Sequence, residues 1–192
     1  MTTKKSFLKQ FWQEKKMVGA MSPSSKFLAH KMLKNIDFKK AKLIVELGPG
    51  NGVFTKKILE KLNPDGKLIV FELNDDFYKS LKSEIQDKRM ILIHDSAEKI
   101  AEYVKKEGFV FADYVISSLP LANFPKKLQE TILKESHDIL KNQGKYIQFQ
   151  YSLLSKKNLE AQFNSIDVSF TPLNFPPAFV YTCVKEKIGI VQ

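Results

Sequence analysis

The chain has few residues that could form covalent or metal cross-links. Of its 192 residues, one is cysteine and three are histidine. A lone cysteine, Cys183, excludes an internal disulfide and fits a reducing compartment, and its apolar surroundings favour a small core residue over a nucleophile. His30, His94 and His137 are scattered without the spacing of metal ligands, so we expect no metal site.

Long apolar runs are also missing. No run reaches the roughly 18 residues needed to span a bilayer. Lysines interrupt the N-terminus where a signal peptide would have its apolar region. We therefore expect a cytoplasmic protein. With 43% hydrophobic residues, the chain fits one ordinary domain with a substantial core.

Acidic residues are scarce at the start of the chain. Of a net charge of +10, most comes from residues 1–42, which hold eleven lysines and two acids. Residues 43–192 hold 20 basic and 19 acidic side chains. This asymmetry indicates a polyanionic partner, either nucleic acid or an anionic membrane surface. We expect a basic helical arm over residues 1–40 and an α/β core over residues 41–192, within a single domain.

Residues 4–17 have the pattern of an amphipathic helix. Bulky apolar side chains on one stripe oppose lysines, which is typical of a helix lying in a lipid interface. Alternatively, the stripe packs on the protein's own core or on a second subunit. In the membrane interpretation, the contacting residues are Phe7, Leu8, Phe11 and Trp12 with Lys4, Lys5, Lys9, Lys15 and Lys16.

The stretch IVELGPGNG, residues 44–52, organises the rest of the chain. Its apolar, β-branched start predicts a buried parallel strand, and a helical pattern follows over residues 53–62. A strand, a glycine turn and a helix form the first half of a βαβ unit. Ligands bind at the carboxyl end of such strands, where glycines allow a close approach to the backbone.

The glycines at 48, 50 and 52 differ from a dinucleotide fingerprint. That fingerprint is GxGxxG and would require glycine at Val53. Glu46 is an acid inside an apolar strand, and burying a carboxylate is costly unless a cation pairs with it. The pattern therefore indicates a cationic ligand group; the alternative is a tight turn with a solvated Glu46.

Alternating strand and helix patterns continue to the C-terminus and predict a mostly parallel sheet with an antiparallel pair at its end. We expect no second domain. The expected strands cover residues 67–72, 90–94, 112–117, 145–151, 166–170 and 179–184. The expected helices cover 22–35, 75–86, about 98–107 and 126–140, with a turn at 142–144.

Several of these segments resemble one known family. The motifs VGAMSPSS, VELGPGNG, HDSA, SSLPL and NFPPAFVY are similar to those of the bacterial phosphatidylethanolamine N-methyltransferases. These are class I enzymes related to the rRNA adenine dimethyltransferases. The resemblance implies a Rossmann-like α/β fold with a seven-stranded sheet, helices on both faces and S-adenosylmethionine as cofactor. The implied cofactor-binding residues are Glu46, Gly48, Pro49, Gly50, Gly52, Glu72, Leu73, Asp95, Ser96 and Ser117.

Roles for three residues follow from this resemblance. Glu46 would face the ammonium of the cofactor's methionine. Glu72, at a strand tip, is placed to accept hydrogen bonds from ribose hydroxyls. Asp95 would accept from the adenine amine, and His94, which stands where the family has glycine, would narrow that pocket. For Glu72 a solvated strand end, and for Asp95 a helix cap, are the alternatives.

The strand-4 motif separates the two related families. Adenine dimethyltransferases have N-L-P-Y there, in which the amide and a backbone carbonyl hold the exocyclic amine and the ring stacks on the flipped base. The matching residues are Ser118, Leu119, Pro120 and Leu121, so the amide and the ring are both missing. Stacking is worth roughly 1–3 kcal/mol per base. The dimethyltransferases also carry a C-terminal RNA-binding domain, whereas this chain ends after its last predicted strand.

The sequence thus predicts an enzyme on the inner face of the membrane that methylates the amine of phosphatidylethanolamine. The alternatives are RNA adenine N-methylation, with the lysine arm binding phosphates, and a catalytically silent cofactor- or RNA-binding module. Tyr181 is a further candidate for a polar contact to the headgroup. The residues expected at the reacting groups are Ser117, Ser118, Leu119, Pro120 and Tyr151.

Overall fold

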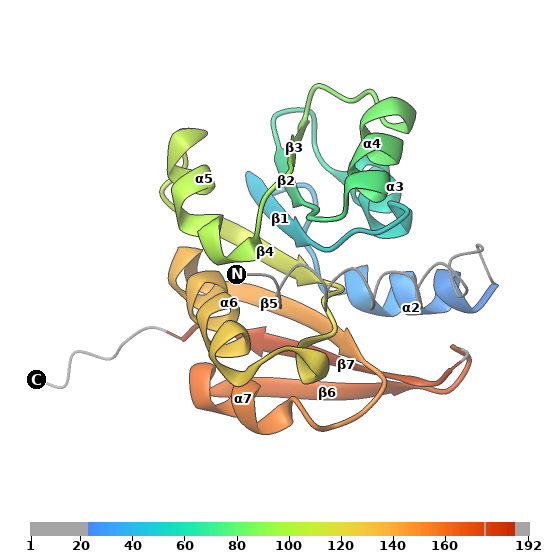
Figure 1. The fold of residues 1–192 in the computed structure, drawn as a ribbon, viewed down its shortest axis with the longest axis vertical. Coiled ribbons are helices and arrows are strands. Elements are labelled where there is room, and N and C mark those ends of the chain that lie inside the picture. Colours follow the sequence, from blue (N-terminus) through green and yellow to red (C-terminus); the bar gives the residue numbers. More distant parts are fainter. Residues whose placement is uncertain (1–22, 175, 187–192) are drawn as a thin grey trace, which may run out of the picture.

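A computed structural model describes residues 23–174 and 176–186. These residues form a seven-stranded sheet with the order β3-β2-β1-β4-β5-β7-β6 (Figure 1). Strands β1 to β5 run parallel, and β7 pairs antiparallel with both β5 and β6. The predicted fold class and the antiparallel terminal pair are confirmed. The strands are β1 Leu43–Leu47, β2 Lys67–Phe71, β3 Met90–Ile93, β4 Ala112–Ser117, β5 Leu140–Gln150, β6 Ser165–Thr171 and β7 Ala178–Val184.

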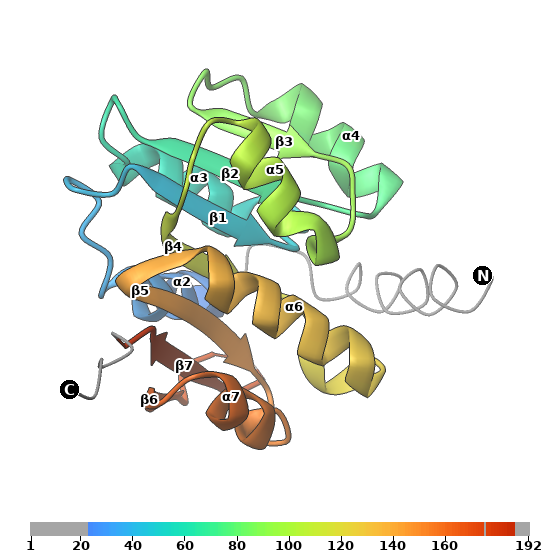
Figure 2. The same ribbon diagram turned by 90° about the vertical axis from the view of Figure 1, so that its left-hand side faces the viewer.

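Helices cover both faces of the sheet. One apolar cluster joins α2 and α3 to the sheet, and another joins α5, α6 and α7 to its other face. Figure 2 shows α2 and α6 on opposite sides of β5. The helices are α2 Pro23–Leu33, α3 Val53–Lys61, α4 Asp75–Glu84, α5 Ile100–Lys106, α6 Lys126–Ile139 and α7 Lys156–Gln162, with 3-10 turns η1 Ala97–Lys99 and η2 Leu121–Asn123.

The sequence pattern predicted the central strand correctly. All five residues of β1 are buried, and such a strand is recognisable by its apolar sequence. A strand buried on both faces must be apolar throughout, as this one is except at Glu46. The sheet brings the carboxyl ends of β1 to β4 to one edge. Each predicted ligand-binding motif follows one of these strands, so the topology gathers them together.

Near the end of the chain, one prediction is corrected and one helix was not anticipated. The expected turn at 142–144 lies inside β5, because Gln143 donates to the carbonyl of Lys185 and Gly144 accepts from the Lys185 amide. Gln143 adopts a φ of 63°, which bends the strand without ending it. Helix α7 was not predicted, since its short polar sequence buries only Leu159 and has no apolar periodicity.

The amphipathic segment 4–17, with Phe7, Leu8, Phe11 and Trp12, lies outside the described residues. Within 23–174 and 176–186, no helix combines the length and the apolar character that crossing a bilayer requires.

The bend between β1 and α3 depends on glycine. Gly48, Gly50 and Gly52 have φ values of 66°, 59° and 75°, in the left-handed region that other residues seldom adopt. A Cβ on Gly52 would lie 2.6 Å from Cδ2 of the buried Leu81 in α4. The bend is therefore fixed both by backbone conformation and by packing of α3 against α4.

We predict that Gly52→Ala lowers the free energy of unfolding by about 2–5 kcal/mol. A left-handed alanine costs about 1–2 kcal/mol, and overpacking against Leu81 adds typically 1–3 kcal/mol. Gly108→Ala is the matched control, because Gly108 has a φ of 82° and nothing within 4 Å of an added Cβ. Urea unfolding of both variants measures the difference; equal losses would show that the contact with Leu81 costs nothing.

Candidate functional site

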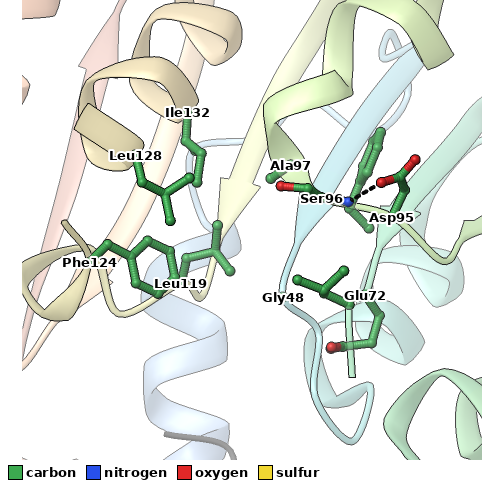
Figure 3. A pocket seen from close by; sticks show the side chains of 11 residues that line it. Gly48, Glu72, Asp95, Ser96, Ala97, Leu119, Phe124, Leu128 and Ile132 are labelled. Carbon is green, nitrogen blue, oxygen red and sulfur yellow. Dashed lines mark hydrogen bonds between the residues drawn. The ribbon is translucent and has the colours of Figure 1, made fainter. Parts of the chain in front are cut away.

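A pocket opens at the carboxyl edge of the sheet, where the glycine bend meets the ends of β2, β3 and β4. Figure 3 shows its two sides: Gly48, Glu72, Asp95 and Ser96 face an apolar wall formed by Leu119 and the start of α6. The lining residues are Gly48, Phe71, Glu72, Leu73, Asp95, Ser96, Ala97, Leu119, Phe124, Leu128 and Ile132.

Glu46 is fully buried in β1 beneath the glycine bend. Among the described residues, neither carboxylate oxygen has a partner at hydrogen-bonding geometry, although Thr55 lies near enough to act on the carboxylate. The pKa of Glu46 is raised to about 8, mainly by burial; the hydroxyl and backbone N–H of Thr55 lower it and the charge of Glu72 raises it. A buried acid without a partner is costly, so the site favours a cation arriving at this position.

Glu72 ties the glycine bend to the end of β2. Its carboxylate accepts from the backbone N–H of Gly50 at 3.1 Å and of Asn74 at 2.8 Å, and it is fully buried. A carboxylate has about four acceptor positions. Glu72, which is predicted to accept hydrogen bonds from the ribose hydroxyls, therefore also holds the glycine bend in place.

Asp95 is fixed by three donors. It accepts from the ammonium of Lys99 at 2.7 Å, the hydroxyl of Tyr103 at 3.0 Å and the backbone N–H of Ser96 at 2.7 Å. Burial alone would raise its pKa, but these hydrogen bonds lower it. Asp95 is therefore an ionised acceptor at neutral pH, with its orientation set before any ligand arrives.

The expectation that His94 narrows the pocket is corrected. Its ring stacks on Tyr78 of α4 with centroids 4.4 Å apart, and its Nε2 lies 3.1 Å from Asp75. These contacts draw the side chain toward α4, and His94 is not among the lining residues.

A buried hydrogen-bond network holds the loop after β4. The carbonyl of Leu119 accepts from Nε2 of Gln148 at 2.8 Å and from Nε2 of Gln150 at 3.0 Å. The hydroxyl of Tyr146 donates to Oε1 of Gln148 at 2.6 Å, and burial raises the pKa of Tyr146, which keeps it a donor. Both glutamines are buried in β5. Two glutamines that alternate with Ile147 and Phe149 at the end of β5 were the sequence signal for this network.

The tyrosines proposed from sequence lie outside the pocket lining. The Tyr181 hydroxyl donates to the carbonyl of Ser152 at 3.4 Å, and the rest of the side chain is buried in the sheet. Tyr151 follows β5 and packs edge-on against Phe149 at 5.6 Å. At the β4 tip, Ser117 is buried, with its hydroxyl accepting from the Leu119 N–H at 3.3 Å.

The structure brings about half of the predicted residues to the pocket wall: Gly48, Glu72, Leu73, Asp95, Ser96 and Leu119. The remaining predicted residues do not line it: Glu46, Pro49, Gly50, Gly52, Ser117, Ser118, Pro120 and Tyr151. The lining residues that were not predicted are Phe71, Ala97, Phe124, Leu128 and Ile132. The spacing of Leu128 and Ile132 on one face of α6 was the available signal.

Relatives of known activity include two kinds of enzyme. An ornithine lipid N-methyltransferase of Singulisphaera acidiphila is 29% identical over 184 residues, which cover 94% of this chain and 96% of that enzyme. A ribosomal RNA small subunit methyltransferase A of Mycoplasmopsis pulmonis is 28% identical over 131 residues, which cover 66% of this chain and 46% of that enzyme.

Solved structures agree on the fold. The 1,6-didemethyltoxoflavin-N1-methyltransferase of Burkholderia thailandensis, solved with S-adenosylhomocysteine, superposes with a TM-score of 0.70 at 13% identity, covering 95% of this chain and 87% of that one. The sequence profile of the ribosomal RNA adenine dimethylase family matches residues 14–144. The chain therefore belongs to this family and is an S-adenosylmethionine-dependent methyltransferase.

Proposed function

We propose that this methyltransferase acts on the amine of a membrane lipid headgroup, with phosphatidylethanolamine as the preferred substrate. The observation that carries the proposal is the loop after β4, which lacks the amide and the aromatic ring of an adenine site. Two buried amides, from Gln148 and Gln150, already donate to the Leu119 carbonyl. A carbonyl oxygen has two lone pairs, so an incoming amine of either kind must be held by other groups.

The side chains of the loop point to the same conclusion. An adenine site needs a stacking ring and an amide beside the reacting nitrogen. Here Ser118 and Leu121 stand at those two positions, and Leu121 is completely buried. A small headgroup amine needs neither feature, because it has no aromatic face to stack.

The lengths of the matches support the lipid reading. The alignment with the ornithine lipid enzyme runs along 96% of that protein, whereas the chain spans about half of the rRNA methyltransferases that it matches. Ornithine lipid and phosphatidylethanolamine share a primary amine on a lipid, so the chemistry of the acceptor is common to both.

The cofactor-holding residues that we propose fit the group's chemistry. Glu46 is a buried acid awaiting a cation, and S-adenosylmethionine carries an α-ammonium group. Glu72 and Asp95 offer carboxylate oxygens on the pocket wall for hydroxyl and amine donors. Leu119, Phe124 and Leu128 supply an apolar surface opposite, suited to a flat ring. When bound, the cofactor supplies an electrophilic methyl group.

This chain's residues then act mainly by positioning. The pocket lining has two carboxylates, Glu72 and Asp95, and both are held by hydrogen bonds to the protein. Neither is poised as a proton acceptor, so we propose that the amine reacts in its neutral form. Backbone carbonyls around Ser117 and Ser118 would orient it, and orientation alone can supply a large part of a barrier.

Methylation of adenine in RNA is a second candidate, because the family profile is that of the rRNA adenine dimethylases. In this alternative the eleven lysines of residues 1–42 would bind phosphates. A steep fall of substrate affinity with salt would then be expected.

A headgroup series tests the proposal. The purified protein is incubated with labelled S-adenosylmethionine and vesicles of phosphatidylethanolamine, ornithine lipid, phosphatidylcholine or phosphatidylglycerol. We expect label in phosphatidylethanolamine, less in ornithine lipid and none in the two lipids without a primary amine. If neither amine lipid were labelled while the same protein preparation methylated RNA, the proposal would be contradicted.

A further inference from the structure

An exposed apolar surface lies beside the reaction loop, at the carboxyl edge of β5 and β6. The apolar side chains with the highest exposed fractions there are Leu154, with 79% of its surface accessible, and Leu173, with 67%. Such side chains are rarely gathered at a functional edge without a partner. The set consists of Tyr151, Leu153, Leu154, Phe170 and Leu173, and we name it the edge surface.

Three contacts hold the segments that carry the edge surface. Tyr151 interacts with the side chain of Asn174, in the turn between β6 and β7. The hydroxyl of Tyr181 holds the carbonyl of Ser152, in the loop after β5. Phe170 packs against Phe179 across the β6–β7 pair, with ring centroids 5.1 Å apart. The loop at 151–155 and the turn at 171–178 are thus held together by the folded sheet.

The edge surface is continuous with the loop that we propose for the acceptor. Gln150 donates to the carbonyl of Leu119, a pocket-lining residue, and the next residue along the chain is Tyr151. A partner on the edge surface would therefore lie next to the mouth of the reaction site.

Positive charge borders this apolar surface. Helix α7 begins directly after Leu154 and Ser155 with Lys156 and Lys157, and α6 begins with Lys126 and Lys127; all four lysines are exposed. Asn158 of α7 donates to Gln129 of α6 at 2.5 Å, so the two lysine pairs are on neighbouring helix starts. Lys126 lies 3.7 Å from Glu130 and Lys156 lies 3.4 Å from Glu160, so the positive charge of each pair rests mainly on its second lysine, Lys127 or Lys157.

We infer that the edge surface is a membrane-docking site, in which leucine and aromatic side chains enter the headgroup–acyl boundary and the lysines contact anionic lipid. Exposed apolar groups rimmed by lysine are the combination that binds such interfaces. The inference rests on the proposed function, and it places the membrane against folded residues in addition to the predicted helix 4–17.

The test is vesicle flotation of the full chain carrying Leu154→Ser and Leu173→Ser. We expect its partition onto vesicles of phosphatidylethanolamine and phosphatidylglycerol to fall at least tenfold, since each leucine loses most of its burial energy. Val110→Ser is the matched control, because Val110 is 77% exposed but precedes β4 at the opposite edge. It should bind as the parent protein does.

A second readout separates this inference from the proposed function. With short-chain phosphatidylethanolamine below its micellar concentration, the double variant should methylate as fast as the parent protein, because no membrane is needed. Unchanged or increased flotation would overturn the inference, as expected if residues 1–22 cover the leucines. The substitutions could instead convert a dimer to a monomer and leave flotation unchanged. That result would assign the edge surface to contact with a second copy of the chain and would also overturn the inference. Failure of the parent protein to methylate any lipid, with flotation lost in the variant, would reject the proposed function alone.

Discussion

Glu46→Gln is expected to weaken S-adenosylmethionine binding about 10- to 100-fold at pH 7.5, because a hydrogen bond to a charged partner is worth about 1.5–3 kcal/mol. The carboxylate is buried, and within the described part of the chain its oxygens have no partner. Glutamine has nearly the same shape but cannot carry the negative charge that we propose to face the cofactor's ammonium.

The same residue predicts a pH dependence of binding. The pKa of Glu46 is raised to about 8 by burial, so below pH 8 the cofactor-free protein holds a proton there. A cationic ligand favours the ionised form of Glu46, so its binding must displace the proton from that carboxyl group. Between pH 6 and 7.5 the affinity should therefore rise up to tenfold per pH unit, with nearly one proton released, and Glu46→Gln should remove both effects.

The cofactor-free protein should respond in the opposite direction. Because the folded pKa of Glu46 lies above the value of 4.5 for the free side chain, its stability falls as the pH rises from 4.5 to 8. Glu46→Gln avoids this cost and should be more stable than the parent by on the order of 3 kcal/mol at pH 7. Titration calorimetry in two buffers and thermal unfolding measure these effects, with exposed Glu60→Gln as the control. A variant that binds with unchanged affinity and pH profile would remove Glu46 from the cofactor site.

Gln148→Met is expected to lower kcat about 100-fold while leaving the KM for S-adenosylmethionine nearly unchanged. Gln148 holds the Leu119 carbonyl and accepts from Tyr146, yet it does not line the pocket. Its loss frees the loop after β4, and a displacement of about 1 Å at a reacting group can cost 10²-fold. Stability should also fall by about 1–3 kcal/mol for the buried groups left unpaired.

Steady-state kinetics at saturating cofactor and urea unfolding measure the two losses. Gln86→Met, on the exposed end of α4, is the control for the substitution itself. If Gln148→Met lost stability but kept kcat, the network would be structural and would not position the loop.

The centre of the fold and the cofactor edge were predictable from the sequence because their determinants are local. In β1, the β-branched run, the acid at Glu46 and the glycine bend stand within a few residues of one another. The β-branched run of β4 is likewise recognisable without its neighbours in space. The apolar wall of Phe124, Leu128 and Ile132 was not predicted, since a helix face that lines a pocket has the same pattern as one that fills a core.

Long-range contacts explain the other misses. Gln148 and Gln150 meet Leu119 across the sheet, at separations of 29 and 31 residues, and no spacing rule in a single sequence encodes that meeting. His94 occupies the position that the family resemblance gave to the adenine pocket, but stacking on Tyr78 directs it elsewhere. In both cases a tertiary contact decides where the side chain points.

Competition in one mixture tests the central claim, that the acceptor is a lipid amine, most directly. The full chain receives limiting labelled S-adenosylmethionine together with phosphatidylethanolamine vesicles and ribosomal RNA at equal concentrations of reactive groups. We expect nearly all the label in the extracted lipid, as methylated headgroup. Label recovered as methyladenine, with unlabelled lipid beside it, would show that the acceptor is RNA.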